Sequence, residues 1–227
     1  MSYAEPIEKP SCVFAADIAF LLDSSDNINA KDFEKQTSLV ISVARTFGIS
    51  QNASRAAVVL YSDTASVRFR FGDSSSTATF VNAVRKMPHE KGGSRLDKAF
   101  EVAIRDVFPS GRVGIPKIAF VVASGKQTSD AKTLDVASEP LRKAGVKVVA
   151  LGVGTEVSAQ DLRSVVEDDE DVWQADSYDQ LILERKNVSQ KICEEAGKLI
   201  GFLFAISSSC LHGNLLTERL PITICFE

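Results

Sequence analysis

The stretch FLLDSSDN, residues 20–27, joins an apolar run to five consecutive side chains that carry oxygen. Asp23, Ser25 and Asn27 stand at alternate positions within it. Hard cations such as Mg²⁺ and Ca²⁺ bind to oxygen ligands, and alternate residues of one turn can direct their oxygens to a single point. The stretch therefore indicates a divalent metal site. The alternative is a hydrogen-bonded turn in which Asp26 or Asn27 caps the following helix.

The elements that must position these residues are apolar strands that alternate with segments of helical period. We expect strands at 17–23, 55–62, 65–71, 116–124, 146–154 and 171–177, and helices at 30–47, 76–87, 94–108, 133–145, 158–166 and 177–200. The second and third strands flank a turn at Asp63 and Thr64 and are expected to form a hairpin. The pattern predicts an α/β fold with a doubly wound, mostly parallel central sheet, one antiparallel edge strand and helices on both faces.

Ligands of doubly wound sheets bind at the carboxyl ends of the strands. The polar segment that begins at Asp23 lies at one such end, and the segment SGKQTSD, which begins at Ser124, lies at another. The nucleotide motifs GxxxxGK[ST] and GxGxxG are missing, as is a GxSxG nucleophile with a histidine partner. We therefore do not expect an enzyme.

Composition and net charge limit the classes of protein to which this chain can belong. The chain has 227 residues, 44% hydrophobic and 25% charged, which is enough to bury a full core. Its net charge of −4 gives no basic excess that would favour nucleic acid. No apolar run reaches the roughly 18 residues of a membrane span, and the polar N-terminus does not look like a signal peptide. The acidic run at 167–171 is expected to be a solvated loop.

The four cysteines, Cys12, Cys193, Cys210 and Cys225, form no CxxC pair, and the chain has only two histidines, which argues against zinc. Cys12 and Cys193 bracket nearly everything that is expected to fold. A bond between them would stabilise the fold by about 4–5 kcal/mol through loop closure, and the alternative is two buried free thiols. Asn52 and Asn187 begin glycosylation sequons, which suit a secreted protein.

Several segments, in order, resemble a von Willebrand factor type A domain from about Cys12 to Leu199. They are DIAFLLDSSDN, AAVVLYSDTASVRF, GGSRLDKAF, PKIAFVVASGK, VKVVALGVG and DSYDQL. The flanking cysteines resemble those of the matrilin and fibril-associated collagen branch, in which the corresponding pair forms a disulfide. We therefore expect an N-terminal extension at 1–11, the domain at 12–200, and an irregular or partly disordered tail at 201–227.

The resemblance also implies a metal-ion-dependent adhesion site built from three loops. The family pattern is Asp-x-Ser-x-Ser, a threonine on a second loop and an aspartate on a third. Asp23 and Ser25 match, whereas Asn27 replaces the last serine, Ser94 the threonine and Ser124 the aspartate. Ser124 removes one of two carboxylates, and charge is the main source of affinity for hard cations. We expect no firmly bound cofactor and at most weak binding of Mg²⁺ or Ca²⁺.

The resemblance implies a secreted adhesion or matrix-assembly module that binds matrix proteins such as collagen. We expect contact through the strand-end rim, defined as Ser25, Asn27, Ser94, Arg95 and Ser124, largely without metal. Arg95 either pairs with an acidic partner or with neighbouring carboxylates. The alternatives are a Mg²⁺-dependent adhesion domain, a structural unit that self-associates through the tail cysteines, and an intracellular scaffold with free thiols.

Overall fold

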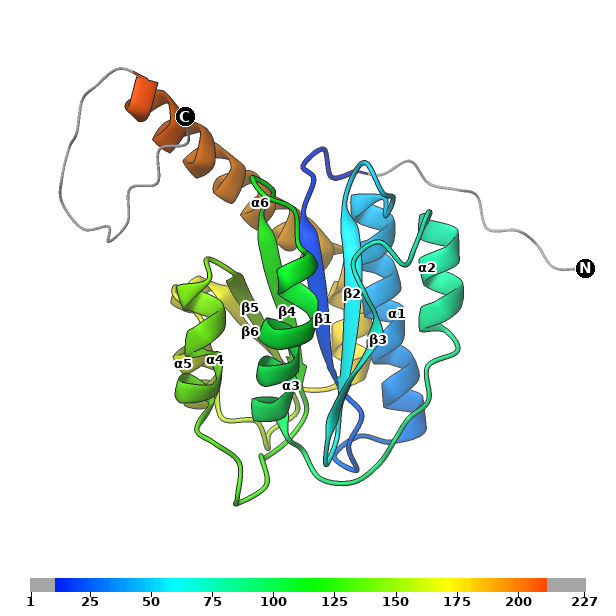
Figure 1. Ribbon diagram of the computed structural model, residues 1–227. Helices are drawn as coiled ribbons and strands as arrows, with labels where there is room; N and C mark the ends of the chain where they lie inside the picture. The colour runs from blue at the N-terminus through cyan, green and yellow to red at the C-terminus, as the bar shows by residue number, and fades with distance from the viewer. Residues whose placement is uncertain (1–10, 212–227) are drawn as a thin grey trace, which may run out of the picture.

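The computed structural model describes residues 11–211, with side chains up to residue 201. Its sheet has the strand order β3-β2-β1-β4-β5-β6, in which only the β2–β3 pair is antiparallel. The strands are β1 (Asp17–Asp23), β2 (Arg55–Tyr61), β3 (Ala65–Phe69), β4 (Lys117–Ala123), β5 (Lys147–Val153) and β6 (Val172–Ala175). The predicted fold class, including the antiparallel edge strand, is confirmed (Figure 1).

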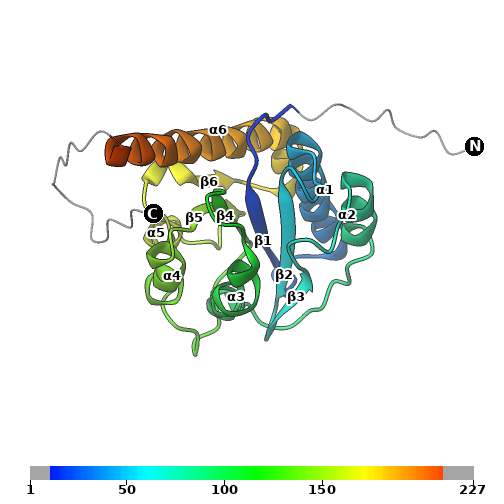
Figure 2. The same cartoon turned by 45° about the horizontal axis from the view of Figure 1, so that its top comes forward.

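Helices cover both faces of this sheet (Figure 2). They are α1 (Ala30–Phe47), α2 (Thr77–Val84), α3 (Leu96–Val102), α4 (Leu134–Lys143), α5 (Ala159–Val165) and α6 (Tyr178–Leu211), with short turns η1 (Ala103–Val107), η2 (Phe108–Ser110) and η3 (Asp169–Asp171). Successive side chains of β1 point to opposite faces. Phe20 and Leu22 therefore pack under α1, α2 and α6, whereas Leu21 packs under α3, α4 and α5. Because both faces are covered, every residue of β1 is buried.

The first helix begins later than the turn interpretation of FLLDSSDN predicts. Asn29 is the N-cap of α1, and its Oδ1 accepts a hydrogen bond of 3.0 Å from the amide of Asp32. Neither Asp26 nor Asn27 caps the helix, so that part of the prediction is wrong. Both residues are exposed in the loop before the cap. Their polar side chains therefore need an explanation other than helix capping.

The last helix is longer than the sequence predicts. α6 continues to Leu211, although the domain was expected to end at residue 200 and to be followed by an irregular tail. Residues 199–206 include leucine and alanine, which favour helix, and no proline follows before Leu211, so the helix continues through Gly201. Its C-terminal part extends past the sheet (Figure 2).

Residues 1–10 and 212–227, with Cys225, lie outside the described residues. No helix of the described part is long and apolar enough to cross a membrane.

The acidic run at 167–171 is not simply a solvated loop. Asp171 is buried and lies 2.6 Å from the ammonium group of Lys147, which is itself buried at the start of β5. Lys147 also contacts Asp168 at 3.1 Å and the α6 residue Glu195 at 4.0 Å. Burial opposes the charge on Lys147, but hydrogen bonds to Asp171 and Asp168 raise its pKa overall. The run thus supplies the counter-ions of a buried lysine.

Cys12 and Cys193 form a disulfide with a Cα–Cα distance of 5.6 Å, as the family resemblance implies. The alternative of two free thiols is therefore wrong. The bond joins the segment before β1 to the middle of α6, across 181 residues of sequence. Nearby, the ring of Phe14 lies against Gly197 so closely that a Cβ there would come within 2.7 Å of it. The bond and this contact hold the N-terminal segment on α6.

Removing this disulfide should destabilise the domain strongly. For a closed loop longer than 100 residues, the variant Cys12→Ser/Cys193→Ser is expected to lose about 4–5 kcal/mol of unfolding free energy, because its denatured chain gains freedom. Guanidinium unfolding followed by circular dichroism measures the change. The variant Cys210→Ser is the control and should unfold like the wild type. Equal midpoints for the wild type and the double variant would contradict the expectation.

Candidate functional site

The candidate site is centred on Asp23, the last residue of β1, which is fully buried. Its Oδ1 accepts a hydrogen bond of 2.8 Å from the amide of Ser25, and its Oδ2 accepts one of 3.3 Å from the amide of Ser124, which directly follows β4. Burial raises the pKa of Asp23, and the hydrogen bonds from Ser25 and Ser124 offset part of that rise. One carboxylate therefore holds together the ends of the two central strands, at which the sequence predicts Asp23 and Ser124 to lie.

The second loop, at 89–94, is bound to the first through backbone groups. The amide of Lys91 donates to Ser24 O at 2.7 Å, and the amide of Asp26 donates to Gly92 O at 2.8 Å. Asp26 Oδ2 in turn accepts from the amide of Gly92 at 3.1 Å. Gly92 has a φ of 102°, and a Cβ there would meet the carboxylate of Asp63 at 2.3 Å. Only glycine fits this junction.

Gln127 joins the second loop to the third. Its Nε2 donates to the hydroxyl of Ser94 at 3.0 Å, while its Oε1 accepts from the amide of Leu96 at 2.6 Å. The amide of Thr128 donates to Ser94 O at 3.1 Å. Sequence reasoning missed Gln127, because a single glutamine three residues after Ser124 has no distinctive pattern. The hydroxyl of Ser94 thus already has a partner inside the protein.

Arg95 pairs with neighbouring carboxylates, which was one of its two predicted alternatives. Its guanidinium group makes two bonds of 2.9 Å with the buried Asp97 and one of 2.8 Å with Asp130. Burial would raise the pKa of Asp97, but hydrogen bonds from Arg95 and the amide of Lys132 lower it overall. Arg95 is therefore a structural anchor for the start of α3, with a half-buried side chain.

Ser124, the residue that replaces the family aspartate, takes part in a buried hydrogen-bond network. Its hydroxyl lies 2.5 Å from that of Tyr178, the first residue of α6. The Tyr178 hydroxyl also lies 3.4 Å from Gln36 Oε1, and Gln36 Nε2 donates to Asp23 O at 2.8 Å. Burial raises the pKa of Tyr178 far above its ordinary value, so the phenol stays protonated. The network ties β1, β4, α1 and α6 together, and sequence reasoning missed both Tyr178 and Gln36.

The residues of the strand-end rim differ in exposure. Ser25, Ser94 and Ser124 are buried, Arg95 is half-buried, and Asn27 is exposed. The side chain of Asn27 lies over Gly125, where a Cβ would come within 2.4 Å of Asn27 Cγ. Among the residues with described side chains, no group of three or more histidine, cysteine or acidic residues could hold a metal ion. The geometry favours polar contact at a surface whose buried hydroxyls are already hydrogen-bonded.

Comparisons with known proteins agree with this geometry. The family model for the von Willebrand factor type A domain matches residues 17–185. Cuticlin-6 of Caenorhabditis elegans is 28% identical over 74% of this chain and 29% of its own length. The human collagen alpha-1(XXI) chain is 27% identical over 83% and 20%, and mouse matrilin-1 is 26% identical over 91% and 40%. The predicted resemblance to the matrilin and collagen branch is confirmed.

A solved structure is similar over the whole domain. Proximal thread matrix protein 1 of the mussel byssus superposes with a TM-score of 0.74 at 29% identity, over 81% of this chain and 47% of that one. Another structure of the same mussel protein, with a TM-score of 0.72, has zinc in its metal-ion-dependent adhesion site (MIDAS) motif. The chain spans less than half the length of each of these relatives.

A double-mutant cycle should show that Ser124 and Tyr178 act as one unit. Ser124→Ala and Tyr178→Phe should each cost about 1–2 kcal/mol of unfolding free energy, because each leaves a buried hydroxyl with a missing partner. The double variant should cost about 1 kcal/mol less than the sum of the two. Urea unfolding of the four proteins gives the coupling.

Ser189→Ala supplies the control for this cycle. It removes another buried hydroxyl, which donates to Arg185 O at 2.7 Å and lies far along α6 from Tyr178. Its cost should add to that of Ser124→Ala within a few tenths of a kcal/mol. Additive costs for Ser124→Ala and Tyr178→Phe would contradict the proposed unit.

Proposed function

This chain belongs to the von Willebrand factor type A domain family, and we propose that it is an extracellular adhesion or matrix-assembly module that binds matrix proteins. Collagen is the first partner to test, because the relatives include collagen chains. The observation that carries the proposal is the set of three interlocked loops at the carboxyl ends of β1 and β4, which is where this fold presents its ligands.

The disulfide supports the extracellular location. Disulfides persist in oxidising compartments and are rare in the cytosol. The bond between Cys12 and Cys193 closes the whole domain and is buried on the Cys12 side. The intracellular alternative depends on free thiols at these positions, so the structure gives it no support. The matrix relatives favour the same location for this chain.

The chemistry of the rim supports binding that is largely independent of metal. Asp23 is the one carboxylate among the five residues that correspond to the family ligands, and both of its oxygens accept backbone hydrogen bonds. The Ser124 hydroxyl bonds with Tyr178 and the Ser94 hydroxyl with Gln127. A hard cation at this rim would gain only one negative charge and would compete for hydroxyls that already have partners. The residues present therefore fit a divalent cation poorly, and we derive no function through one.

Exposure indicates where a partner would touch the rim. Asn27 reaches solvent and lies on Gly125, between the first and third loops. Asp26 and Lys91 are exposed beside it, and Lys91 Nζ lies 3.7 Å from Asp26 Oδ1. In this proposal the partner contacts these exposed polar groups, while the buried residues Ser25, Ser94 and Ser124 hold the loops in place.

A solid-phase binding assay tests the function. The domain should bind immobilised fibrillar collagen or another matrix glycoprotein of a test panel, and EDTA should change binding less than about twofold. Asn27→Ala should weaken it about fivefold, since one well-placed contact is worth about 1 kcal/mol. Asn82→Ala, the same change at an exposed position of α2, should leave binding unchanged.

Two results would count against this account. Complete loss of binding in EDTA would contradict metal independence while keeping the adhesion function. Failure to bind every member of the panel, by a folded and disulfide-bonded domain, would contradict the adhesion function itself. If Asn27→Ala and Asn82→Ala weaken binding equally, the rim is not the contact surface.

A further inference from the structure

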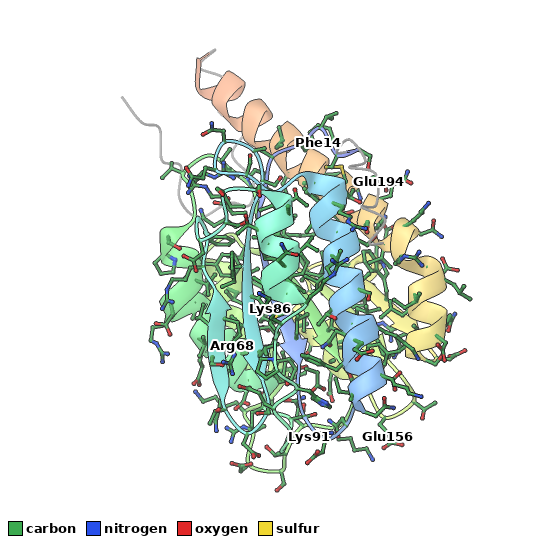
Figure 3. The ribbon with its side chains drawn as sticks, turned by 90° about the vertical axis from the view of Figure 1, so that its right-hand side faces the viewer. Phe14, Arg68, Lys86, Lys91, Glu156 and Glu194 are labelled. Carbon is green, nitrogen blue, oxygen red and sulfur yellow. A yellow bond between two sulfur atoms is a disulfide. The ribbon has the colours of Figure 1, made fainter. Side chains whose placement is uncertain are left out.

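A hollow of about 520 Å³ lies beside the rim, between the β4–α4 loop and the β5–α5 loop. Its volume is within the range of pockets that hold small ligands. Glu156, on its edge, lies at the same end of the molecule as Lys91 of the second loop, and opposite to Phe14 and Glu194 (Figure 3). A partner that covers the rim would therefore also cover this hollow.

The floor of the hollow is apolar. Ala123, Leu134, Val157 and Leu162 line it, and all four belong to the core cluster on the α4 and α5 side of the sheet. Gly152 of β5 makes this arrangement possible, because a Cβ there would come within 2.7 Å of Leu162 and 3.2 Å of Val157. Leu134 and Val157 each keep 8% of their surface exposed and can contact a methylene chain, whereas Leu162 supports them from the interior.

The mouth is charged. Lys126 and Glu156 approach to 3.5 Å across it, from the two different loops, with 81% and 69% of their side chains exposed. An exposed pair of this kind contributes little to stability, so a competing cation can displace Lys126 from Glu156. Asp161 is also exposed at the mouth. With one lysine and two carboxylates, the lining has a net negative charge.

Two residues that line the hollow also contact the strand-end rim. Gln127 lines it and, through its amide, holds the hydroxyl of Ser94 and the amide of Leu96. Gly125 lines it too, and lies under Asn27 of the rim. The rim and the hollow therefore form one continuous surface rather than two separate sites.

We propose that this hollow is the specificity pocket of the adhesion surface and takes a long basic side chain, arginine or lysine, from the partner protein. The methylene stem lies on Leu134 and Val157, and the cationic end replaces Lys126 at Glu156 and reaches Asp161. This inference rests on the proposed function, since it names the side chain that the adhesion surface selects.

The test uses a small probe and needs no matrix partner. N-acetyl-arginine N-methylamide is titrated into the ¹⁵N-labelled domain, and amide shifts are followed by NMR. A roughly millimolar Kd is expected for a ligand of this size. Shifts should centre on Gly125, Val157 and Leu162. N-acetyl-norleucine N-methylamide, which keeps the stem and lacks the charge, should bind more weakly.

Variants separate the charge from the shape. Glu156→Gln/Asp161→Asn should weaken the arginine probe roughly tenfold, as expected for two exposed charge contacts. Lys126→Gln should strengthen it, because it removes the competing cation. The matched control Glu167→Gln/Asp169→Asn changes two exposed acids in the loop that contacts Lys147, at the other end of β5, and should have no effect.

Each outcome decides the proposal. Equal affinity for the norleucine probe, equal effects of the two double variants, or no shift at the pocket would overturn it. Collagen binding that is unaffected by Glu156→Gln/Asp161→Asn, together with a silent probe, would overturn the pocket alone. If the arginine probe binds as expected but the domain binds no matrix protein, the pocket proposal stands and the adhesion function is contradicted.

Discussion

The buried carboxylate of Asp23 is the constraint on which the rest of the site depends. A fully buried aspartate needs hydrogen-bond donors, and the backbone amides of Ser25 and Ser124 supply them. Those two bonds set the path of the chain after β1 and after β4. The 89–94 loop then closes on Ser24 and Asp26, and Gln127 attaches it to the third loop. Asp23, at the end of β1, thus fixes two of the three loops directly, and the 89–94 loop packs against them.

Ser124 also connects this surface to helix α6. Where the family pattern has an aspartate, Ser124 bonds with Tyr178, so the first residue of α6 is fixed at the rim. The middle of α6 is fixed by the disulfide at Cys193 and by the contact of Glu195 with Lys147. Helix α6 is thus held at the rim and at the opposite end of the sheet. Hydrogen bonds and packing hold the rim residues in the positions described.

Much of this could be predicted from the sequence, for identifiable reasons. Strands such as 17–23 and 117–123 are continuous apolar runs, which indicate burial on both faces, and their alternation with helices predicts a doubly wound, mostly parallel sheet. Asp23 and Ser124 were therefore expected at strand ends, and the observed strand order makes those two strands neighbours. The Cys12–Cys193 pairing followed from the family resemblance and not from spacing.

The remaining features depend on contacts between residues far apart in the chain. Gln36 and Tyr178 are 142 residues apart and look like ordinary helix residues, yet they complete the network around Asp23 and Ser124. Asp171 appears to belong to a solvated acidic run until Lys147 is placed beside it. Likewise, the pocket near Glu156 is formed by two loops whose separation only the folded sheet defines.

We propose that the rim needs no firmly bound divalent cation, because Ser124 replaces one carboxylate of the family pattern. Calorimetric titration of Mg²⁺ and Mn²⁺ into the wild type and into Ser124→Asp tests this proposal. The wild type should show no binding at micromolar metal, and the variant should bind measurably, because a second carboxylate then faces Asp23. Micromolar binding by the wild type would contradict it.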